Sequence, residues 1–183
     1  MKSILLLVLI GIAAGCSVSS NVPVYSTVPD FSLTERSNRP ITRKDLEGKV
    51  WVADFIFTYC SGICPTMSAN MEKLQARLSK DVMLVSFTVD PKNDTPAVLT
   101  EYARRYNADP ERWLFLTGDV EGIQKLSMDG FKLAIDTESG TEVEPITHSS
   151  RFVLVDREGR IRGYYGTEDA DALDRLVADV SKL

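Results

Sequence analysis

The sequence holds few of the side chains that bind transition metals or act as nucleophiles: three cysteines and one histidine among 183 residues. It also lacks a cluster of lysine and arginine, and its net charge is −5 at pH 7. Together these features exclude a basic nucleic-acid-binding surface. There is no internal repeat and no low-complexity tract, which excludes a repeat architecture. Apolar residues make up 44% and charged residues 26%, proportions that are ordinary for a globular protein.

Long apolar runs are missing as well, except at the N-terminus. There, Lys2 precedes an apolar run over residues 4–14 that is too short for a stable membrane span of ~20 residues. The run ends in small residues, which is typical of a secretory signal. Because it stops at Cys16, it resembles a bacterial lipoprotein signal. We expect residues 1–15 to be a signal peptide, Cys16 to be lipidated and residues 16–27 to be a tether. An ordinary signal peptide with an incidental cysteine is the alternative.

The remaining chain predicts one α/β domain over residues 28–183. Strands alternate with helices along it, and it is long enough to bury a core without disulfides. The spacing of Met67 and Met71 favours the buried face of a helix over a copper-binding methionine box. The expected elements, in chain order, are a hairpin turning near Ser37 and Asn38, a short helical piece closing at Gly48, strands at 50–58, 82–90 and 113–119, helices at 65–79, 95–107 and 120–131, a hairpin at 150–166 and a helix at 168–183.

The segment "DFIFTYCSGICPTM" places Cys60 and Cys64 directly after an expected buried strand. Ligands bind at that end of the strands in open α/β sheets. If a helix begins at either cysteine, residues four apart lie ~5–6 Å from each other, close enough for a disulfide or a shared metal. A helix N-terminus also favours thiolates. The pair therefore predicts thiol–disulfide exchange or the binding of a soft metal, with Cys60 as the attacking thiol and Cys64 as the resolving one.

The single histidine, His148, lies just before an expected hairpin, in a loop that can reach the cysteines. Two sulfurs and one imidazole suit Cu(I), and they suit Cu(II) if water or a fourth protein ligand is added. Structural zinc sites usually have four protein ligands, and no further cysteine or histidine is available. We expect Cys60, Cys64 and His148 to bind one copper ion per chain. A surface histidine without a function is the alternative.

Four further residues are expected to support or flank this site. Pro65 should fix the start of the helix, and Tyr59 should shield one side of the sulfurs. Asp90 could support the site or recognise a partner, or it could cap the turn before a proline. For Asp94 we expect a structural role, in which the segment Asp94-Thr95-Pro96 caps the helix that follows with Thr95 as the N-cap.

Four blocks of the sequence resemble those of the Sco/SenC family: "DFIFTYCSGICPTM", "FTVDPKNDTPAVLTEYA", "WLFLTG" and "THSSRFVLVDREGRIRGYY". The resemblance runs from about Val28 to the C-terminus. It implies a thioredoxin-like fold, with a central mixed sheet flanked by helices and an N-terminal β-hairpin extension. It also implies copper bound by Cys60, Cys64 and His148.

By the same resemblance, the protein would be a membrane-tethered metallochaperone. It would deliver copper to the CuA site in subunit II of cytochrome c oxidase, or reduce the cysteines of that site. Its other partners would be a thiol reductant or a copper donor outside the cytoplasm. We expect a monomer anchored to a bacterial membrane, on the periplasmic face if the cell is Gram-negative. The lipid anchor would replace the transmembrane helix of other members.

Two other functions remain open. In the first, the protein is an extracytoplasmic thiol–disulfide oxidoreductase that uses Cys60 and Cys64 without a metal. In the second, it is a peroxiredoxin-like peroxidase, a class that shares the fold and the "PDFSL" block. That class places a Pro-x-x-x-Thr/Ser loop before its peroxidatic cysteine, and "FIFTYCSGIC" lacks it.

Overall fold

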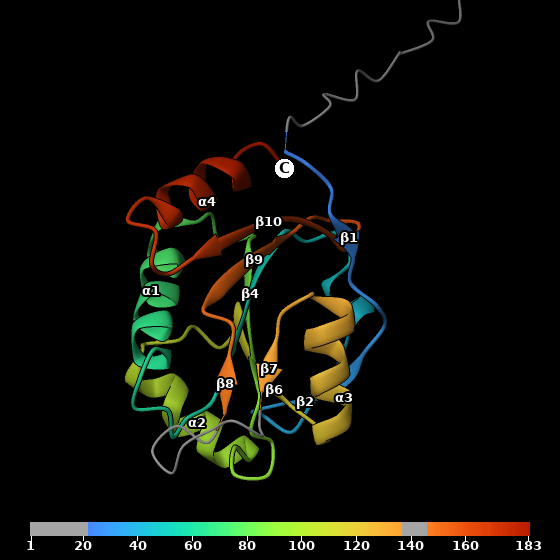
Figure 1. Cartoon of the computed structure of the whole chain (residues 1–183), viewed down its shortest axis with the longest axis vertical. Coiled ribbons are helices and arrows are strands. Elements are labelled where there is room, and N and C mark those ends of the chain that lie inside the picture. Colours follow the sequence, from blue (N-terminus) through green and yellow to red (C-terminus); the bar gives the residue numbers. More distant parts are fainter. Residues whose placement is uncertain (1–21, 137–145) are drawn as a thin grey trace, which may run out of the picture.

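A computed structural model describes residues 22–136 and 146–183, and its centre is an eight-stranded sheet (Figure 1). The strand order is β1-β10-β9-β4-β5-β6-β2-β3, and β7 and β8 form a separate two-stranded sheet. The strands are β1 Ser26–Thr27, β2 Ser32–Glu35, β3 Pro40–Thr42, β4 Trp51–Ile56, β5 Met83–Thr88, β6 Trp113–Thr117, β7 Ile135–Asp136, β8 Thr147–His148, β9 Arg151–Val155 and β10 Arg160–Gly166. The helices are α1 Cys64–Arg77, α2 Pro96–Arg105, α3 Val120–Lys125 and α4 Ala172–Val180, with short helical turns at Arg43–Leu46 and Leu126–Gly130.

The sheet is mixed. Strands β4, β5 and β6 are parallel, and α1 and α2 connect them. Strands β9 and β10 extend the sheet on one side in antiparallel fashion, and the β2–β3 hairpin extends it on the other. The hairpin turns at Asn38, whose φ of 64° lies in the left-handed region that asparagine tolerates. The α/β class, the mixed sheet and the N-terminal hairpin are therefore as expected.

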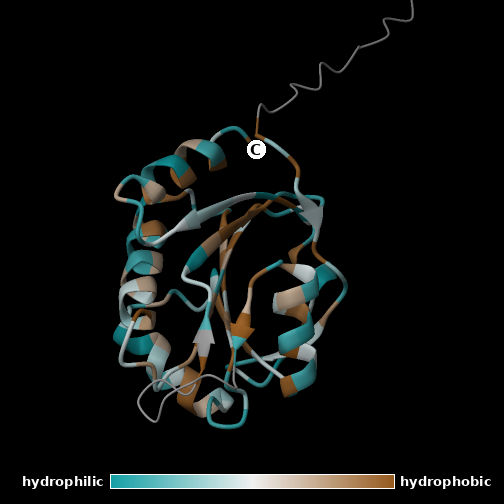
Figure 2. Ribbon diagram, viewed as in Figure 1, coloured by the Kyte–Doolittle hydropathy of each residue, from teal (hydrophilic) through white to brown (hydrophobic). Residues whose placement is uncertain are grey.

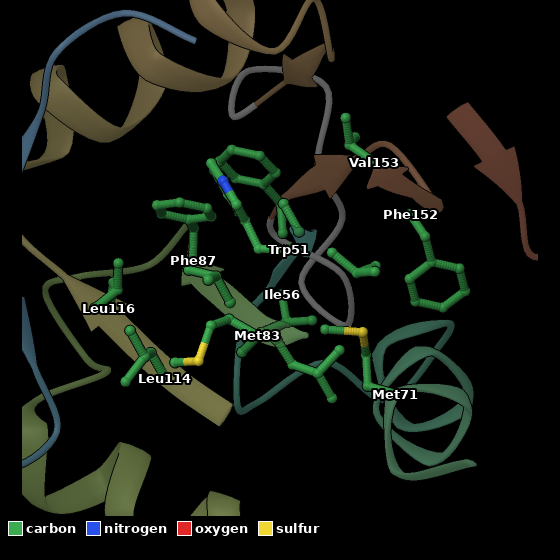
Figure 3. Packing of buried hydrophobic residues seen from close by; sticks show 14 of the residues in the cluster. Trp51, Ile56, Met71, Met83, Phe87, Leu114, Leu116, Phe152 and Val153 are labelled. Atoms are coloured by element: carbon green, nitrogen blue, oxygen red, sulfur yellow. The ribbon is translucent and has the colours of Figure 1, made fainter. Parts of the chain in front are cut away.

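Helices cover both faces of the sheet (Figure 1). Every residue of β4 is buried, as predicted for a central strand covered on both faces. On the face toward α3, the rings of Phe55 and Phe87 stack at 5.0 Å, and Phe131 meets Phe55 edge-on at 5.3 Å. The side chains of Met67 and Met71 in α1 are both fully buried, and Figure 3 shows Met71 within the apolar cluster. These methionines belong to the helix core, as expected, and not to a methionine box.

Hydropathy follows this layering. The central strands are hydrophobic, whereas hydrophilic residues mark the outward faces of the helices (Figure 2). Among residues 22–136 and 146–183, no helix is both long and apolar enough to cross a bilayer.

The folded chain begins before the expected boundary at Val28. Strand β1 pairs with β10, and the Arg162 guanidinium donates hydrogen bonds to the carbonyls of Val22 and Pro23. The same guanidinium forms a buried ion pair with Asp156 at 2.8 Å. Residues 22–27, which sequence analysis assigned to the tether, thus lie along the edge of the sheet. Residues 1–21, including the expected signal peptide and Cys16, lie outside the described part of the chain.

Candidate metal and redox site

Three side chains from three separate elements meet beyond the C-terminal end of β4. The ligand atoms of Cys60, Cys64 and His148 all lie within 4.8 Å of one another. Cys60 belongs to the loop that follows β4, Cys64 is the first residue of α1, and His148 ends β8. In the described part of the chain, no other set of three histidine, cysteine or acidic residues comes together in this way.

The two cysteines have different surroundings. Helix α1 begins at Cys64, with Pro65 in its first turn, so Cys60 precedes the helix and the pair does not share a helical face. Cys64 is fully buried, whereas Cys60 is partly exposed, and both are free thiols. The greater exposure of Cys60 agrees with the expectation that it is the attacking thiol.

Electrostatics separate the two thiols further. Burial acts to raise the pKa of Cys60, but hydrogen bonds with His148, Cys64 and the backbone of Gly62 outweigh it and lower this pKa to about 7. Burial raises the pKa of Cys64 well above its ordinary value, and the neighbouring Cys60 and Asp54 raise it more. Near neutral pH, Cys60 is therefore partly thiolate while Cys64 keeps its proton.

His148 presents one ring nitrogen to the sulfurs. Its Nε2 lies 3.0 Å from Sγ of Cys64, and its Nδ1 lies 3.1 Å from the carbonyl oxygen of Ser149. Because a carbonyl only accepts hydrogen bonds, we assign a proton to Nδ1, so that Nε2 faces the cysteines. When Nε2 is also protonated it donates a hydrogen bond to the Cys60 thiolate, and when it is not, its lone pair is free for a metal. Such a backbone contact commonly orients a metal-binding histidine. The ring also packs edge-on against Phe57 at 5.7 Å.

The donor set fits a soft metal ion. It offers two sulfurs and one imidazole nitrogen, a combination that suits copper and falls short of the four protein ligands of a structural zinc site. The cysteines can also form a disulfide with each other, because they are close and both free. The geometry thus allows both kinds of chemistry predicted from the spacing.

Asp54 is a buried residue near the site that sequence analysis missed. It lies on β4 opposite Ser86 and is fully buried, and neither carboxyl oxygen has a hydrogen-bond partner of normal geometry among the described residues. Burial raises its pKa to about 7, while Ser86 and His148 act in the opposite direction. The one available signal was an acidic residue inside the otherwise apolar strand "VWVADFIFT".

The expected supporting residues take different places. Asp90 is part of a turn: its carboxylate accepts a hydrogen bond from the Asn93 side chain at 2.8 Å, and its carbonyl accepts the backbone N–H groups of Asn93 and Asp94. This matches the turn interpretation, and Asp90 is not in the group of converging ligands. The side chain of Tyr59 is 80% exposed, so the shielding of the sulfurs expected of it remains a prediction.

The segment 94–96 caps α2 as expected, through Thr95 and not through Asp94. The hydroxyl of Thr95 caps the helix by accepting the N–H of Val98. The side chain of Asp94 turns inward instead, and it accepts hydrogen bonds from the hydroxyls of Thr58 and Thr88, each at 2.5 Å.

Alkylation should reveal the low pKa of Cys60. In the reduced, metal-free protein, we expect the rate of iodoacetamide modification at Cys60 to rise about fivefold from pH 6 to 7 and to level off above pH 8, because the thiolate fraction saturates. Peptide mapping by mass spectrometry at each pH measures this rate. In His148→Ala the pH at which the modification rate of Cys60 is half-maximal should be higher, because a hydrogen bond to the Cys60 thiolate is lost. A wild-type rate that still climbs steeply beyond pH 8.5 would contradict the assignment.

Asp54 should make stability depend on pH. The folded state keeps the Asp54 proton up to about pH 7, while the unfolded chain loses it near pH 4, so wild-type stability falls between these values by up to ~4 kcal/mol. Asp54→Asn lacks this loss and should gain stability relative to wild type across the same window. Urea unfolding of both proteins from pH 4 to 8 measures the difference, with the exposed Asp129→Asn as control. If the free energies of unfolding of wild type and Asp54→Asn differed by the same amount from pH 4 to 8, Asp54 would have no raised pKa.

Comparison with known proteins identifies the family. The SCO1/SenC family model matches residues 21–183. A SCO1/SenC family lipoprotein from Bacillus anthracis has the same fold, with a TM-score of 0.80 and 36% identity over 86% of this chain and 95% of that one. BsSco, described as a Sco family cytochrome c oxidase assembly protein with a disulfide switch, has a TM-score of 0.77 and 35% identity over 88% of this chain and 95% of its own.

A copper-bound relative is also similar. ScoI from Bradyrhizobium japonicum, solved with copper bound, has a TM-score of 0.71 and 25% identity over 86% of this chain and 99% of its own. These matches confirm the thioredoxin-like fold expected from the sequence. Because the family model spans all of the described residues, the chain belongs to the SCO1/SenC family.

Proposed function

We propose that this protein binds one copper ion through Cys60, Cys64 and His148 and passes it to a partner. The observation that carries the proposal is the convergence of three ligand atoms within 4.8 Å from a loop, a helix and a strand. The copper-bound Bradyrhizobium relative supports copper as the ion. Because cysteines bind copper as thiolates and a disulfide does not, the cysteines must be reduced before loading.

The unequal burial of the ligands suggests how copper would leave. Cys64 is fully buried, and His148 is oriented by its contact with the Ser149 carbonyl. Cys60 is the more exposed thiol and lines a surface groove of about 510 Å³ together with residues of α2. We therefore infer that a ligand of the acceptor first replaces Cys60, and that Cys64, the buried ligand, releases the ion last.

The acceptor we propose is the CuA site in subunit II of cytochrome c oxidase. The description of BsSco as a cytochrome c oxidase assembly protein supports this choice. A CuA site contains cysteine ligands, so the same acceptor could receive copper or electrons from Cys60 and Cys64.

We propose that a lipid on Cys16 anchors the protein to a bacterial membrane outside the cytoplasm, on the periplasmic face if the cell is Gram-negative, after removal of residues 1–15. The Bacillus anthracis relative, described as a lipoprotein, supports this. Arg162 binds both the Val22 carbonyl and the carboxylate of Asp156, so Val22 lies near Asp156. Asp156 directly follows β9, whose last residue pairs with the first residue of β4. The anchor would therefore attach at the end of the sheet opposite the cysteines, leaving the site open to a partner.

A second candidate function is thiol–disulfide exchange, and the contrast between the two thiols favours it. The Cys60 thiolate would attack a disulfide of the partner, forming a mixed disulfide and releasing one partner thiolate. Cys64 would then lose its proton to water and attack the Cys60 sulfur. That step forms the Cys60–Cys64 disulfide and releases the second thiolate, so the partner gains two electrons. The disulfide switch described for BsSco supports this candidate.

Copper titration tests the proposed function. We expect reduced protein to develop an intense thiolate-to-copper absorption band that saturates at one equivalent of Cu(II). Cys60→Ser and Cys64→Ser should abolish the band, and His148→Ala should shift it and weaken binding, because each removes a ligand. Met71→Leu, a core change outside the site, serves as control.

Two results would contradict copper binding. One is oxidation of Cys60 and Cys64 to a disulfide with the copper left in solution, which would favour the second candidate. The other is a His148→Ala titration identical to wild type, which would remove the histidine from the site.

A further inference from the structure

The three proposed ligands are supported in different ways. Cys64 is fixed by helix α1, and His148 by strand β8 and the Ser149 carbonyl. Cys60 lies in the loop over residues 57–63, where its backbone N–H donates to the Phe57 carbonyl at 3.3 Å and closes a turn. The position of the Cys60 sulfur therefore depends on what holds that turn.

A carboxylate from a different loop holds the turn. Asp94, between β5 and α2, accepts a hydrogen bond from the Thr58 backbone N–H at 3.1 Å and from the Thr58 hydroxyl at 2.5 Å. Thr58 is the second residue of the turn that ends at Cys60. Among the described residues, the other side-chain hydrogen bonds to this loop involve the sulfurs of Cys60 and Cys64 themselves.

This arrangement buries an acidic side chain. The Asp94 carboxyl is fully buried, and burial raises its pKa. Its hydrogen-bond donors are two threonines, Thr58 and Thr88, and no arginine or lysine of the described chain pairs with it. Burying a carboxylate without a cation is expensive unless its hydrogen bonds are all satisfied. Because Thr95 already caps α2, Asp94 is not needed there.

The neighbouring loop keeps Asp94 in place. The Thr88 hydroxyl donates to Asp94 and also accepts the backbone N–H of Asp90 at 3.0 Å. The backbone N–H of Asp94 in turn donates to the Asp90 carbonyl at 2.9 Å. Residues of β5 and the β5–α2 loop thus fix the Asp94 carboxylate. Its hydrogen bonds with Thr58 link that loop to the turn that ends at Cys60.

We propose that Asp94 is a positioning residue for copper binding: through Thr58 it fixes the turn that places the Cys60 sulfur beside Cys64 and His148. This inference rests on the proposed function, because it concerns how Cys60 is presented to copper. Asp94 itself does not touch the ion.

Two substitutions at Thr58 and one at Asp94 test the proposal. Thr58→Val removes the hydroxyl donor with little change in shape, and Thr58→Ser keeps the hydroxyl. Asp94→Asn keeps the size of the side chain but removes its charge. The matched control is Tyr165→Phe, which removes another hydroxyl–carboxylate hydrogen bond, 2.8 Å from Tyr165 to Asp179. Tyr165 lies on β10, which is separated from β4 by β9.

Two quantities are measured for each reduced protein. Competition with a chelator gives copper affinity, and mass-spectrometric amide hydrogen exchange without metal gives the protection of residues 58–63. We expect Thr58→Val and Asp94→Asn to weaken copper binding about 10- to 100-fold, as typical for residues that orient metal ligands. Exchange in the loop should become about tenfold faster. Thr58→Ser should restore both, and Tyr165→Phe should change neither.

The outcomes separate this inference from the proposed function. If Thr58→Val and Asp94→Asn lose stability in urea but keep wild-type copper affinity and loop exchange, Asp94 has a purely structural role and the inference is wrong. If Asp94→Asn does not fold, Thr58→Val alone decides. If wild type binds no copper, the proposed function fails. The exchange measurement then still shows whether Asp94 fixes the turn, and unchanged exchange would overturn that as well.

Discussion

The contact between His148 Nε2 and Cys64 Sγ, at 3.0 Å, joins two parts of the fold that share no backbone pairing. Cys64 belongs to the helix that follows β4, whereas His148 lies on the small β7–β8 sheet. The proposed site exists only while these elements stay together. The Ser149 carbonyl and the Phe57 ring orient the imidazole toward the cysteines. If the His148–Cys64 contact were lost, the three ligand atoms would no longer lie together.

Around this contact the protein combines a fixed part with an accessible one. Cys64 is buried and keeps its proton, and Cys60 is exposed enough to meet a partner and has a lower pKa. Two buried acids flank the pair, Asp54 in β4 and Asp94 beside the turn, and neither forms an ion pair with a lysine or arginine of the described residues. A buried acid lowers the stability of the folded state. Destabilising features of this kind are common where a functional site must keep a defined geometry.

The sequence was a good guide wherever local pattern decides structure. Apolar runs and turn residues predicted β4, the β2–β3 hairpin and the helices, and the four-residue spacing with a lone histidine predicted the ligand set. Side-chain directions that depend on contacts distant in sequence could not be predicted. Asp94 follows a turn and precedes Thr95, a pattern typical of helix capping, and only the packing of the Cys60 loop against β5 shows it bound to Thr58. Similarly, Asp54 is conspicuous in its strand, but that no described residue gives it a hydrogen bond of normal geometry is a property of the packed core.

The central claim is that two cysteines and one histidine bind a single copper ion. X-ray absorption spectroscopy of the Cu(I)-loaded protein tests it most directly, because it counts the sulfur and nitrogen atoms around the metal. The account predicts two sulfurs and one imidazole nitrogen per copper, with the nitrogen lost in His148→Ala and both sulfurs retained. A site with sulfur ligands alone, or a His148→Ala spectrum identical to wild type, would contradict it.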